Sequence, residues 1–287
     1  EPEVEQGSFA TIIVSSGGGL SSVSCELFDR ESKSISSSQG FLTDDPDLST
    51  SMVSLLGIPH TIIPGVYRLR VKGLENGAEF SLETSLSVRK KTFVYEEIPL
   101  SSAMSELRES DDPRKVEEAV RLMALYQQFD PENLYFTKQL CLPIDQERRT
   151  AFFGDKRKFI YPDGSTSVSI HYGIDFGGKR GTPVFAAGDG RVVMASERII
   201  TGRSVVIEHL PGVFTSYFHL DEILVKEGDI VRQHMPIGKL GATGFVTGPH
   251  LHWEFRVSGV AVSPDRALSN PLIDKSIIFS TISNAND

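Results

Sequence analysis

The segment "GFVTGPHLHWEF", residues 244–255, reads as a strand in the second half of the chain and places two histidines one residue apart in an apolar, aromatic run. Residues i and i+2 of a strand point to the same side, so His250 and His252 share one face, while Leu251 and Trp253 point into a core. Such a pair of imidazoles suits a metal site, a ligand paired with a general base, or an exposed strand face without a function. The spacing alone leaves all three interpretations open.

A second motif, "HYGID" at residues 171–175, adds one imidazole and one carboxylate. In a straight strand His171 and Asp175 would lie about 13 Å apart, at ~3.3 Å per residue, which is too far to share an ion. Gly173 and its β-forming neighbours argue against a helix, so we expect the chain to bend at this glycine. Two histidines, one carboxylate and a water molecule make an ordinary catalytic zinc shell with one position left for substrate.

The sequence around these motifs predicts a mostly β protein. Segments such as "GRSVVIEHLPG" (202–212) are strands broken by Gly and Pro, and we expect an all-β domain without helices over residues 146–277, followed by a polar tail at 278–287. Residues 1–96 also read as short strands that alternate at period two, for example "GVYRLRVKG" (65–73), separated by Gly-, Ser- and Asp-rich turns. This spacing predicts an N-terminal immunoglobulin-like β-sandwich.

The segment between the two β regions, residues 97–145, is predicted to be a helical connector. Asp112 is a candidate N-cap and Pro113 a candidate first helical residue. A further short helix is expected within residues 101–110. The amphipathic pattern after Pro113 predicts a helix packed on a neighbouring domain, with a buried stripe made of Val116, Val120, Met123 and Gln127 and with Ala119 and Tyr126 beside it.

Composition limits the class of protein. The chain has 287 residues, 39% hydrophobic and 23% charged, which favours two globular domains. A net charge of −9 argues against nucleic acid as a partner. The sequence contains no apolar run long enough to span a membrane. It begins at Glu1 without a methionine, so we expect a processed or shortened form in which an export signal is not visible.

Three motifs together resemble one family. "HYGIDFGGKRGTPVFAAGDGRVV", "YFHL" and "TGPHLHWEF" occur in the order and at separations typical of the lysostaphin-type, or LytM-like, zinc metallopeptidases that cut peptidoglycan. The resemblance covers roughly residues 146–275, including "FGDKR" (153–157) and "SNPL" (269–272). It does not extend to the N-terminal region or the connector.

The resemblance implies a site residue by residue. His171 and Asp175 match the two zinc ligands of the family's HxxxD motif, and His252, the second histidine of HxH, matches the third ligand for one zinc ion. His250 and His219 match the two catalytic histidines that do not bind the metal. One of them would take a proton from the zinc-bound water and the other would stabilise the oxyanion, in an order that the sequence leaves open.

The remaining histidines and the cysteines receive no catalytic role. His60, His209 and His234 are predicted to be structural. Cys25 and Cys141 are expected to be two separate thiols, although a disulfide stays open, and a Cys141 metal ligand is not expected. Tyr217 shares the strand face of His219 and would either line the cleft or pack in the core.

The resemblance to this family implies a zinc-dependent endopeptidase that acts on stem peptides or cross-bridges of bacterial peptidoglycan and is exported to the periplasm or cell envelope. Glycyl-glycine bridges and direct D-alanyl cross-links both suit the family. Two alternatives stay open: a non-catalytic module that binds the wall or activates an amidase, and a latent enzyme whose N-terminal region blocks the cleft, with Asn133 as a candidate to fill the open zinc position. The N-terminal domain is also a candidate to bind other cell-division or wall proteins.

Overall fold

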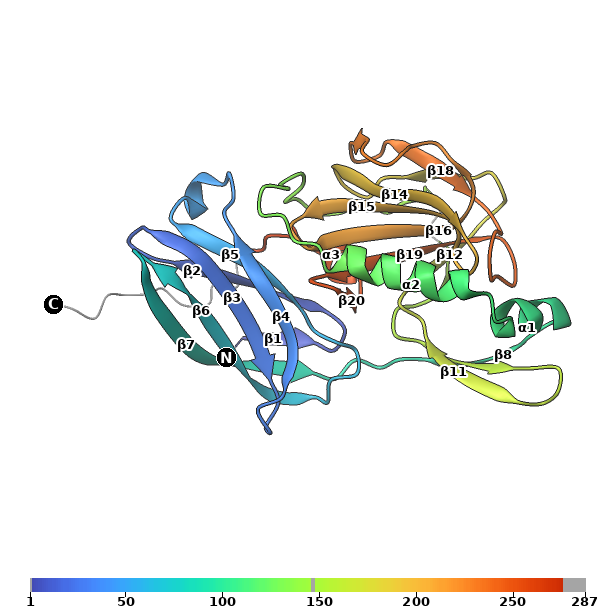
Figure 1. Cartoon of the computed structure of the whole chain (residues 1–287), viewed down its shortest axis with the longest axis horizontal. Helices are drawn as coiled ribbons and strands as arrows, with labels where there is room; N and C mark the ends of the chain where they lie inside the picture. The colour runs from blue at the N-terminus through green and yellow to red at the C-terminus, as the bar shows by residue number, and fades with distance from the viewer. Residues whose placement is uncertain (1, 146–147, 276–287) are drawn as a thin grey trace.

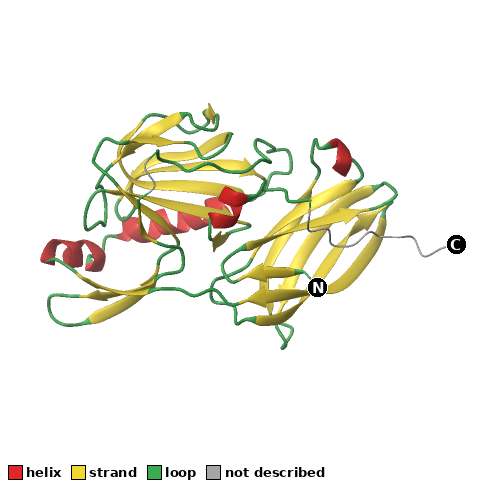
Figure 2. Ribbon diagram, turned by 180° about the vertical axis from the view of Figure 1, so that it is seen from behind, coloured by secondary structure: helices red, strands yellow, loops and turns green. Residues whose placement is uncertain are grey.

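The computed structural model describes residues 2–145 and 148–275, so the predicted tail at 278–287 lies outside the described part of the chain. The fold is mostly β, as predicted, and a seven-stranded sheet lies beside a ten-stranded sheet (Figures 1 and 2). None of the helices in the described residues has the length and apolar character needed to cross a membrane.

The N-terminal region forms one curved sheet with the strand order β1-β7-β6-β3-β4-β5-β2. Its elements are β1 (Glu3–Glu5), β2 (Phe9–Ser15), β3 (Leu20–Phe28), β4 (Ser34–Phe41), the 3-10 turn η1 (Pro46–Leu48), β5 (Ser51–Gly57), β6 (Gly65–Glu75) and β7 (Ala78–Arg89). Strand β4 pairs with β3 and, through Gly40 and Phe41, also with β5. Strand β4 thus links the two parts of this N-terminal sheet, β1-β7-β6-β3 and β5-β2, into a nearly closed barrel. The predicted immunoglobulin-like sandwich is therefore not confirmed.

A small sheet connects the two halves. Strand β8 (Tyr95–Pro99) pairs in parallel with β10 (Lys156–Ile160), which forms a hairpin with β11 (Thr166–Ile170). Two helices follow β8 in the chain, α1 (Ser102–Glu109) and α2 (Pro113–Tyr126), as the sequence predicts. The predicted boundaries at 96 and 145 stay predictions, but β8 shows that the segment before the helices joins a sheet formed by the second half of the chain.

The second half is built on the ten-stranded sheet, with the central order β17-β14-β15-β16-β19-β12-β9. Its strands are β9 (Arg149–Ala151), β12 (Gly173–Gly177), β13 (Pro183–Phe185), β14 (Gly190–Arg198), β15 (Gly202–Leu210), β16 (Val213–Ile223), β17 (Ile230–Val231), β18 (Pro236–Leu240), β19 (His250–Val257) and β20 (Val260–Val262). The expectation of no helix in this part was wrong in one place, since α3 (Asp265–Ser269) follows β20.

Helix α2 lies across the sheet at β14, β15 and β16 (Figure 1), but it packs through a different face from the predicted one. Val116 and Val120 are 67% and 62% exposed. The buried residues are Tyr126, which the sequence placed beside the stripe, and Leu122 and Leu125, which it did not; all three form a core cluster with side chains of the sheet such as Phe214. The predicted stripe was wrong because these three bulkier residues, which also share a helical face, bury more apolar surface.

The N-terminal sheet shares a hydrophobic core with the second half of the chain. Phe9 contacts Phe255 edge-to-face at a ring-centroid distance of 5.7 Å, and Ser258 Oγ donates a hydrogen bond to the Leu55 carbonyl oxygen at 2.9 Å. Strand β5 also approaches β19 so closely that a Cβ on Gly57 would lie 2.6 Å from the Val257 carbonyl oxygen. The two halves are therefore joined by apolar packing as well as by the chain.

We expect a fragment that begins at residue 146 to be much less stable than the whole chain. It would expose Phe255 and Val257 to water and remove β8 from the small sheet, and each large apolar side chain contributes about 1.5–3 kcal/mol when buried. The unfolding temperatures of both proteins in one buffer test this expectation. Equal unfolding temperatures would mean that the shared core contributes little. The latency hypothesis predicts that this fragment is more active per folded molecule than the whole chain, and equal activities would contradict it.

Candidate metal centre

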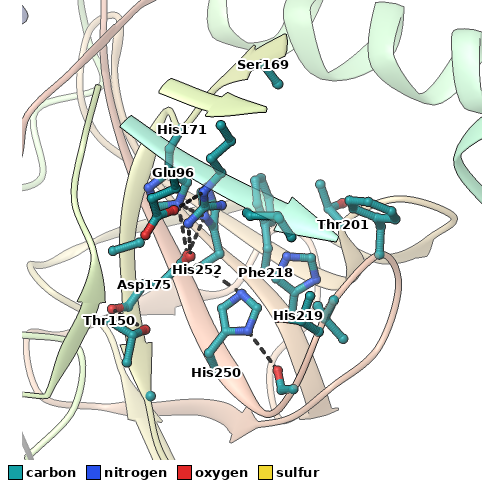
Figure 3. A pocket seen from close by; sticks show the side chains of 18 of the residues that line it. Glu96, Thr150, Ser169, His171, Asp175, Thr201, Phe218, His219, His250 and His252 are labelled. Atoms are coloured by element: carbon teal, nitrogen blue, oxygen red, sulfur yellow. Dashed lines mark hydrogen bonds and ion pairs between the residues drawn. The ribbon is translucent and has the colours of Figure 1, made fainter. Parts of the chain in front are cut away.

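Three ligand atoms from separate parts of the chain converge at one point (Figure 3). His171 Nε2 lies 3.0 Å from Asp175 Oδ1 and 2.8 Å from His252 Nδ1, and the last two atoms are 2.8 Å apart. All three residues are buried. Because zinc binds nitrogen and carboxylate oxygen at about 2.0–2.2 Å, atoms this close together can share one ion.

Hydrogen bonds on the outer side of each ring fix which nitrogen faces this point. His171 Nδ1 lies 2.8 Å from the Phe152 carbonyl oxygen and must carry a hydrogen to donate to it. His252 Nε2 lies 3.1 Å from Glu254 Oε1 and donates in the same way. In the neutral rings, His171 Nε2 and His252 Nδ1 therefore carry lone pairs, and both face Asp175 Oδ1. Because these three atoms all present lone pairs to one another, a cation is required between them.

The electrostatic field at this point also favours positive charge. Burial would lower the pKa of His252, but the carboxylates of Asp175 and Glu254 outweigh burial and raise this pKa to about 9. Burial would raise the pKa of Asp175, whereas hydrogen bonds from His171 and His252, which these rings can donate only in their protonated form, hold it well below its usual range. The donor set and its charge therefore fit a divalent metal such as zinc.

The local fold explains how the ligands meet. Strand β12 pairs with β19 so that Asp175 lies opposite His252, and His171 lies in the break between β11 and β12. A Cβ on Gly173 would lie 2.4 Å from the Trp253 carbonyl oxygen and 2.9 Å from His252 Nε2. The bend therefore falls just before Gly173, and this glycine is needed for close approach to β19 rather than for an unusual backbone conformation.

The second oxygen of Asp175 has a partner that sequence reasoning missed. Arg157 Nη2 donates to Asp175 Oδ2 at 2.7 Å, and Arg157 Nε lies 3.3 Å from Glu96 Oε2. Glu96 is on β8 and Arg157 on β10, so the small sheet holds the carboxylate in place. The pairing of β8 with β10 spans about sixty positions of sequence and has no local pattern that could have predicted it.

His250 and His219 lie beside the three converging residues, with ring centroids 4.9 Å apart. His250 Nδ1 lies 2.9 Å from the Gly248 carbonyl oxygen, and His219 Nδ1 lies 2.9 Å from the Thr243 carbonyl oxygen. Each ring therefore keeps Nε2 as an acceptor in its neutral form. Burial lowers the pKa of both, to about 3 for His219, so both are neutral at pH 7 and able to accept a proton.

His219 has a strained backbone. Its φ is +62°, a left-handed conformation that is uncommon for residues other than glycine. Strand β16 pairs with β19 as far as Phe218 and with β18 from Leu220, so His219 lies where the strand changes partner. This local distortion directs the His219 ring to the cavity that also contains His250, as distortions next to active sites often do.

These five residues line a cleft of about 900 Å³. Part of the lining comes from the small sheet and α1, with Glu96, Arg108 and Phe159 among its residues. The segment before β19 adds Pro249 and Phe245, and the Phe245 ring contacts the Phe159 ring edge-to-face at a centroid distance of 5.6 Å. Arg108 lies over the ring of Phe159 at 4.3 Å. A cleft of this size and mixed polarity can accept a peptide segment, and part of it is built by residues that precede the predicted β domain.

Other residues named from the sequence lie outside this cleft. Tyr217 is fully buried and its hydroxyl accepts a hydrogen bond from the Ala187 backbone nitrogen at 2.9 Å, so it packs in the core. Asn133 donates to Glu208 Oε2 at 2.9 Å and does not line the cleft, which removes the basis for its predicted contact with the metal. Cys25 and Cys141 are free thiols.

The three remaining histidines also lie away from the converging ligand atoms. His60 is half-buried and packs against Phe93, Phe153 and Tyr172. His234 is exposed. His209 is completely buried, with Nδ1 2.7 Å from the Asp189 carbonyl oxygen and Nε2 2.7 Å from Thr215 Oγ1.

The buried His209 predicts a loss of stability in acid. Burial lowers its pKa from 6.5 to about 4, so the folded state binds a proton less readily than the unfolded state. Neutral His209 therefore contributes about 3 kcal/mol to the free energy of unfolding. This contribution is complete above pH 6.5 and is lost as the pH drops toward 4. Urea unfolding at pH 7 and pH 4.5 should show a smaller pH-dependent loss for His209→Gln than for the wild type. The same loss in both proteins would contradict this role, and His234→Gln serves as the surface control.

Comparison with known proteins identifies the domain that carries the five site residues. Residues 169–264 match the profile of Peptidase family M23. Peptidoglycan DD-endopeptidase ShyC of Vibrio cholerae is 42% identical over 122 residues, which are 42% of this chain and 28% of that protein. DD-carboxypeptidase/endopeptidase Mpg of Neisseria meningitidis is 43% identical over 95 residues, 33% of this chain and 22% of that protein.

A solved structure extends the likeness in fold to most of the chain. The crystal structure of a putative peptidase M23 from Pseudomonas aeruginosa matches with a TM-score of 0.60 and 23% identity, over 90% of this chain and 92% of that one. The chain therefore contains a peptidase domain of family M23, which confirms the resemblance predicted from the three motifs. It spans less than a third of the length of the curated relatives reported above.

Proposed function

We propose that this protein is a zinc-dependent endopeptidase that hydrolyses peptide cross-links of bacterial peptidoglycan. The observation that carries the proposal is the convergence of three lone-pair atoms beside two neutral histidines in one cleft. His171, Asp175 and His252 would hold one zinc ion, with His250 and His219 as the catalytic pair. A bound zinc ion supplies Lewis acidity, which polarises the scissile carbonyl group and lowers the pKa of a bound water molecule toward ~7.

The residues around the ion would then move the protons. The Nε2 atoms of His250 and His219 are free acceptors, so either ring can take a proton from the attacking water and later deliver it to the leaving amine. The ring that is protonated can donate a hydrogen bond to the oxyanion. Arg157 keeps Asp175 oriented throughout, because it donates to the oxygen that faces away from the ligand triangle.

Direct cross-links are the favoured substrate. Both relatives reported above have DD-endopeptidase or DD-carboxypeptidase/endopeptidase in their names, which favours a scissile bond between D-centres over a bond between achiral glycines. Such a substrate implies export to the periplasm or cell envelope. The two alternatives, a non-catalytic wall module and a latent enzyme, predict different fragment release from purified sacculi.

Mass spectrometry of fragments released from purified sacculi tests the proposal. Cross-linked dimers should become monomers in the presence of the zinc-loaded protein, a chelator should stop the conversion, and added zinc should restore it. Protein that sediments with the sacculi and releases nothing would overturn the enzyme proposal and favour the binding module. Release of glycan fragments with intact peptide cross-links would overturn the choice of bond.

A further inference from the structure

Beyond the three ligand residues, a row of side chains on β19 continues away from the metal centre. His252, Glu254 and Arg256 alternate along the strand, so all three project from the same face. Each is bonded to the next: His252 Nε2 lies 3.1 Å from Glu254 Oε1, and Glu254 Oε2 accepts hydrogen bonds from Arg256 Nε at 2.9 Å and Nη2 at 2.7 Å. All three residues are buried.

We propose that Glu254 is a positioning residue for the metal ligand His252, and that Arg256 holds Glu254 in place. The inference rests on the proposed zinc site. A neutral imidazole has one N–H and one lone pair, so a partner that accepts the N–H decides which nitrogen binds the metal. Glu254 accepts from Nε2 and leaves Nδ1 to face His171 and Asp175. A carboxylate in this position also makes the ligand nitrogen more basic.

The carboxylate of Glu254 is itself held on both oxygens. One oxygen faces His252 and the other accepts two hydrogen bonds from Arg256, so the side chain cannot rotate without breaking a buried ion pair. Breaking such a pair is strongly unfavourable, because it leaves an unpaired charge without water. Phe218 also restricts rotation of the His252 ring, since the two rings stack in parallel at a centroid distance of 5.7 Å.

Helix α2 closes the far end of the row. The Arg256 guanidinium lies over the Tyr126 ring at 4.8 Å and near the Tyr172 ring at 5.3 Å. The Tyr126 hydroxyl is hydrogen-bonded to Ser216 Oγ at 2.5 Å, which fixes the ring against the sheet. A helix that precedes the M23 domain in sequence therefore supports the ligand His252 through Arg256 and Glu254.

The test is the zinc affinity of full-length Glu254→Gln, measured by competition with a chromophoric chelator at constant pH. The amide keeps the size of the side chain but is a weaker acceptor, and loss of such an outer partner weakens metal binding by ~10–100-fold. Glu208→Gln is the matched control, because Glu208 is also buried and bonded to an arginine, Arg191, but contacts no ligand. It should bind zinc as tightly as the wild type.

Three outcomes are distinguishable. Wild-type protein that fails to bind zinc would overturn the proposed function itself. Wild-type protein that binds zinc with the same affinity as Glu254→Gln would overturn the positioning role, and equal weakening in Glu208→Gln would assign the effect to general destabilisation. If Glu254→Gln does not fold, nitrogen-15 NMR of the zinc-loaded wild type decides: metal at His252 Nδ1 with hydrogen on Nε2 supports the proposal, and metal at Nε2 contradicts it.

Discussion

Replacing His250 with alanine is expected to leave zinc bound but to lower turnover on cross-linked peptidoglycan by ~10²–10⁴-fold. His250 Nε2 lies 3.7 Å from Asp175 Oδ1, outside the tight triangle of ligand atoms, and its Nδ1 is held by the Gly248 carbonyl oxygen. The ring is thus oriented to accept a proton near the ion without being required to bind it. The loss should appear in kcat, because proton transfer matters only in the transition state.

Zinc content and turnover measured on the same samples check this expectation. His219→Ala should behave like His250→Ala, and the double variant should lose less than the product of the two effects if both rings serve one proton transfer. His234→Ala, at an exposed position, is the control. Turnover in His250→Ala equal to that of the wild type would remove His250 from the mechanism, and loss of zinc would make it a ligand.

Replacing Asp175 or His171 with alanine is expected to weaken zinc binding by more than ~100-fold, since even the loss of an outer partner costs ~10–100-fold. Asp175→Ala also leaves the Arg157 guanidinium with one carboxylate partner fewer and removes negative charge from the site. Zinc content after dialysis at limiting free zinc measures the effect. Asp221→Ala removes a carboxylate that is paired with Arg180 on a different surface and should retain zinc. Full zinc occupancy in both ligand variants would contradict the assignment.

The sequence was sufficient for the parts of the site that depend on local geometry. Alternation along a strand placed His250 and His252 on one face, with Leu251 and Trp253 in the core, and the structure confirms both buried residues. The distance limit across residues 171–175 required a bend, and His171 indeed lies in a break between strands. The mostly β fold also follows from the β-branched, Gly-broken segments.

The rest depends on contacts between distant segments. Glu96 reaches Arg157 only because β8 pairs with β10, and no residue near either strand encodes that pairing. The buried face of α2 was predicted wrongly because two apolar faces compete on that helix, and the sheet below selects the one with Leu122, Leu125 and Tyr126. Glu254 could have been suggested by alternation alone, since it follows His252 at i+2 on the same face.

The central claim is that one zinc ion is held by His171, Asp175 and His252. Crystals of the zinc-loaded protein measured on both sides of the zinc absorption edge test it most directly. The account predicts one anomalous peak about 2.0–2.2 Å from His171 Nε2, Asp175 Oδ1 and His252 Nδ1. A peak bound to other residues, or no peak at this position in protein that cleaves peptidoglycan, would contradict it.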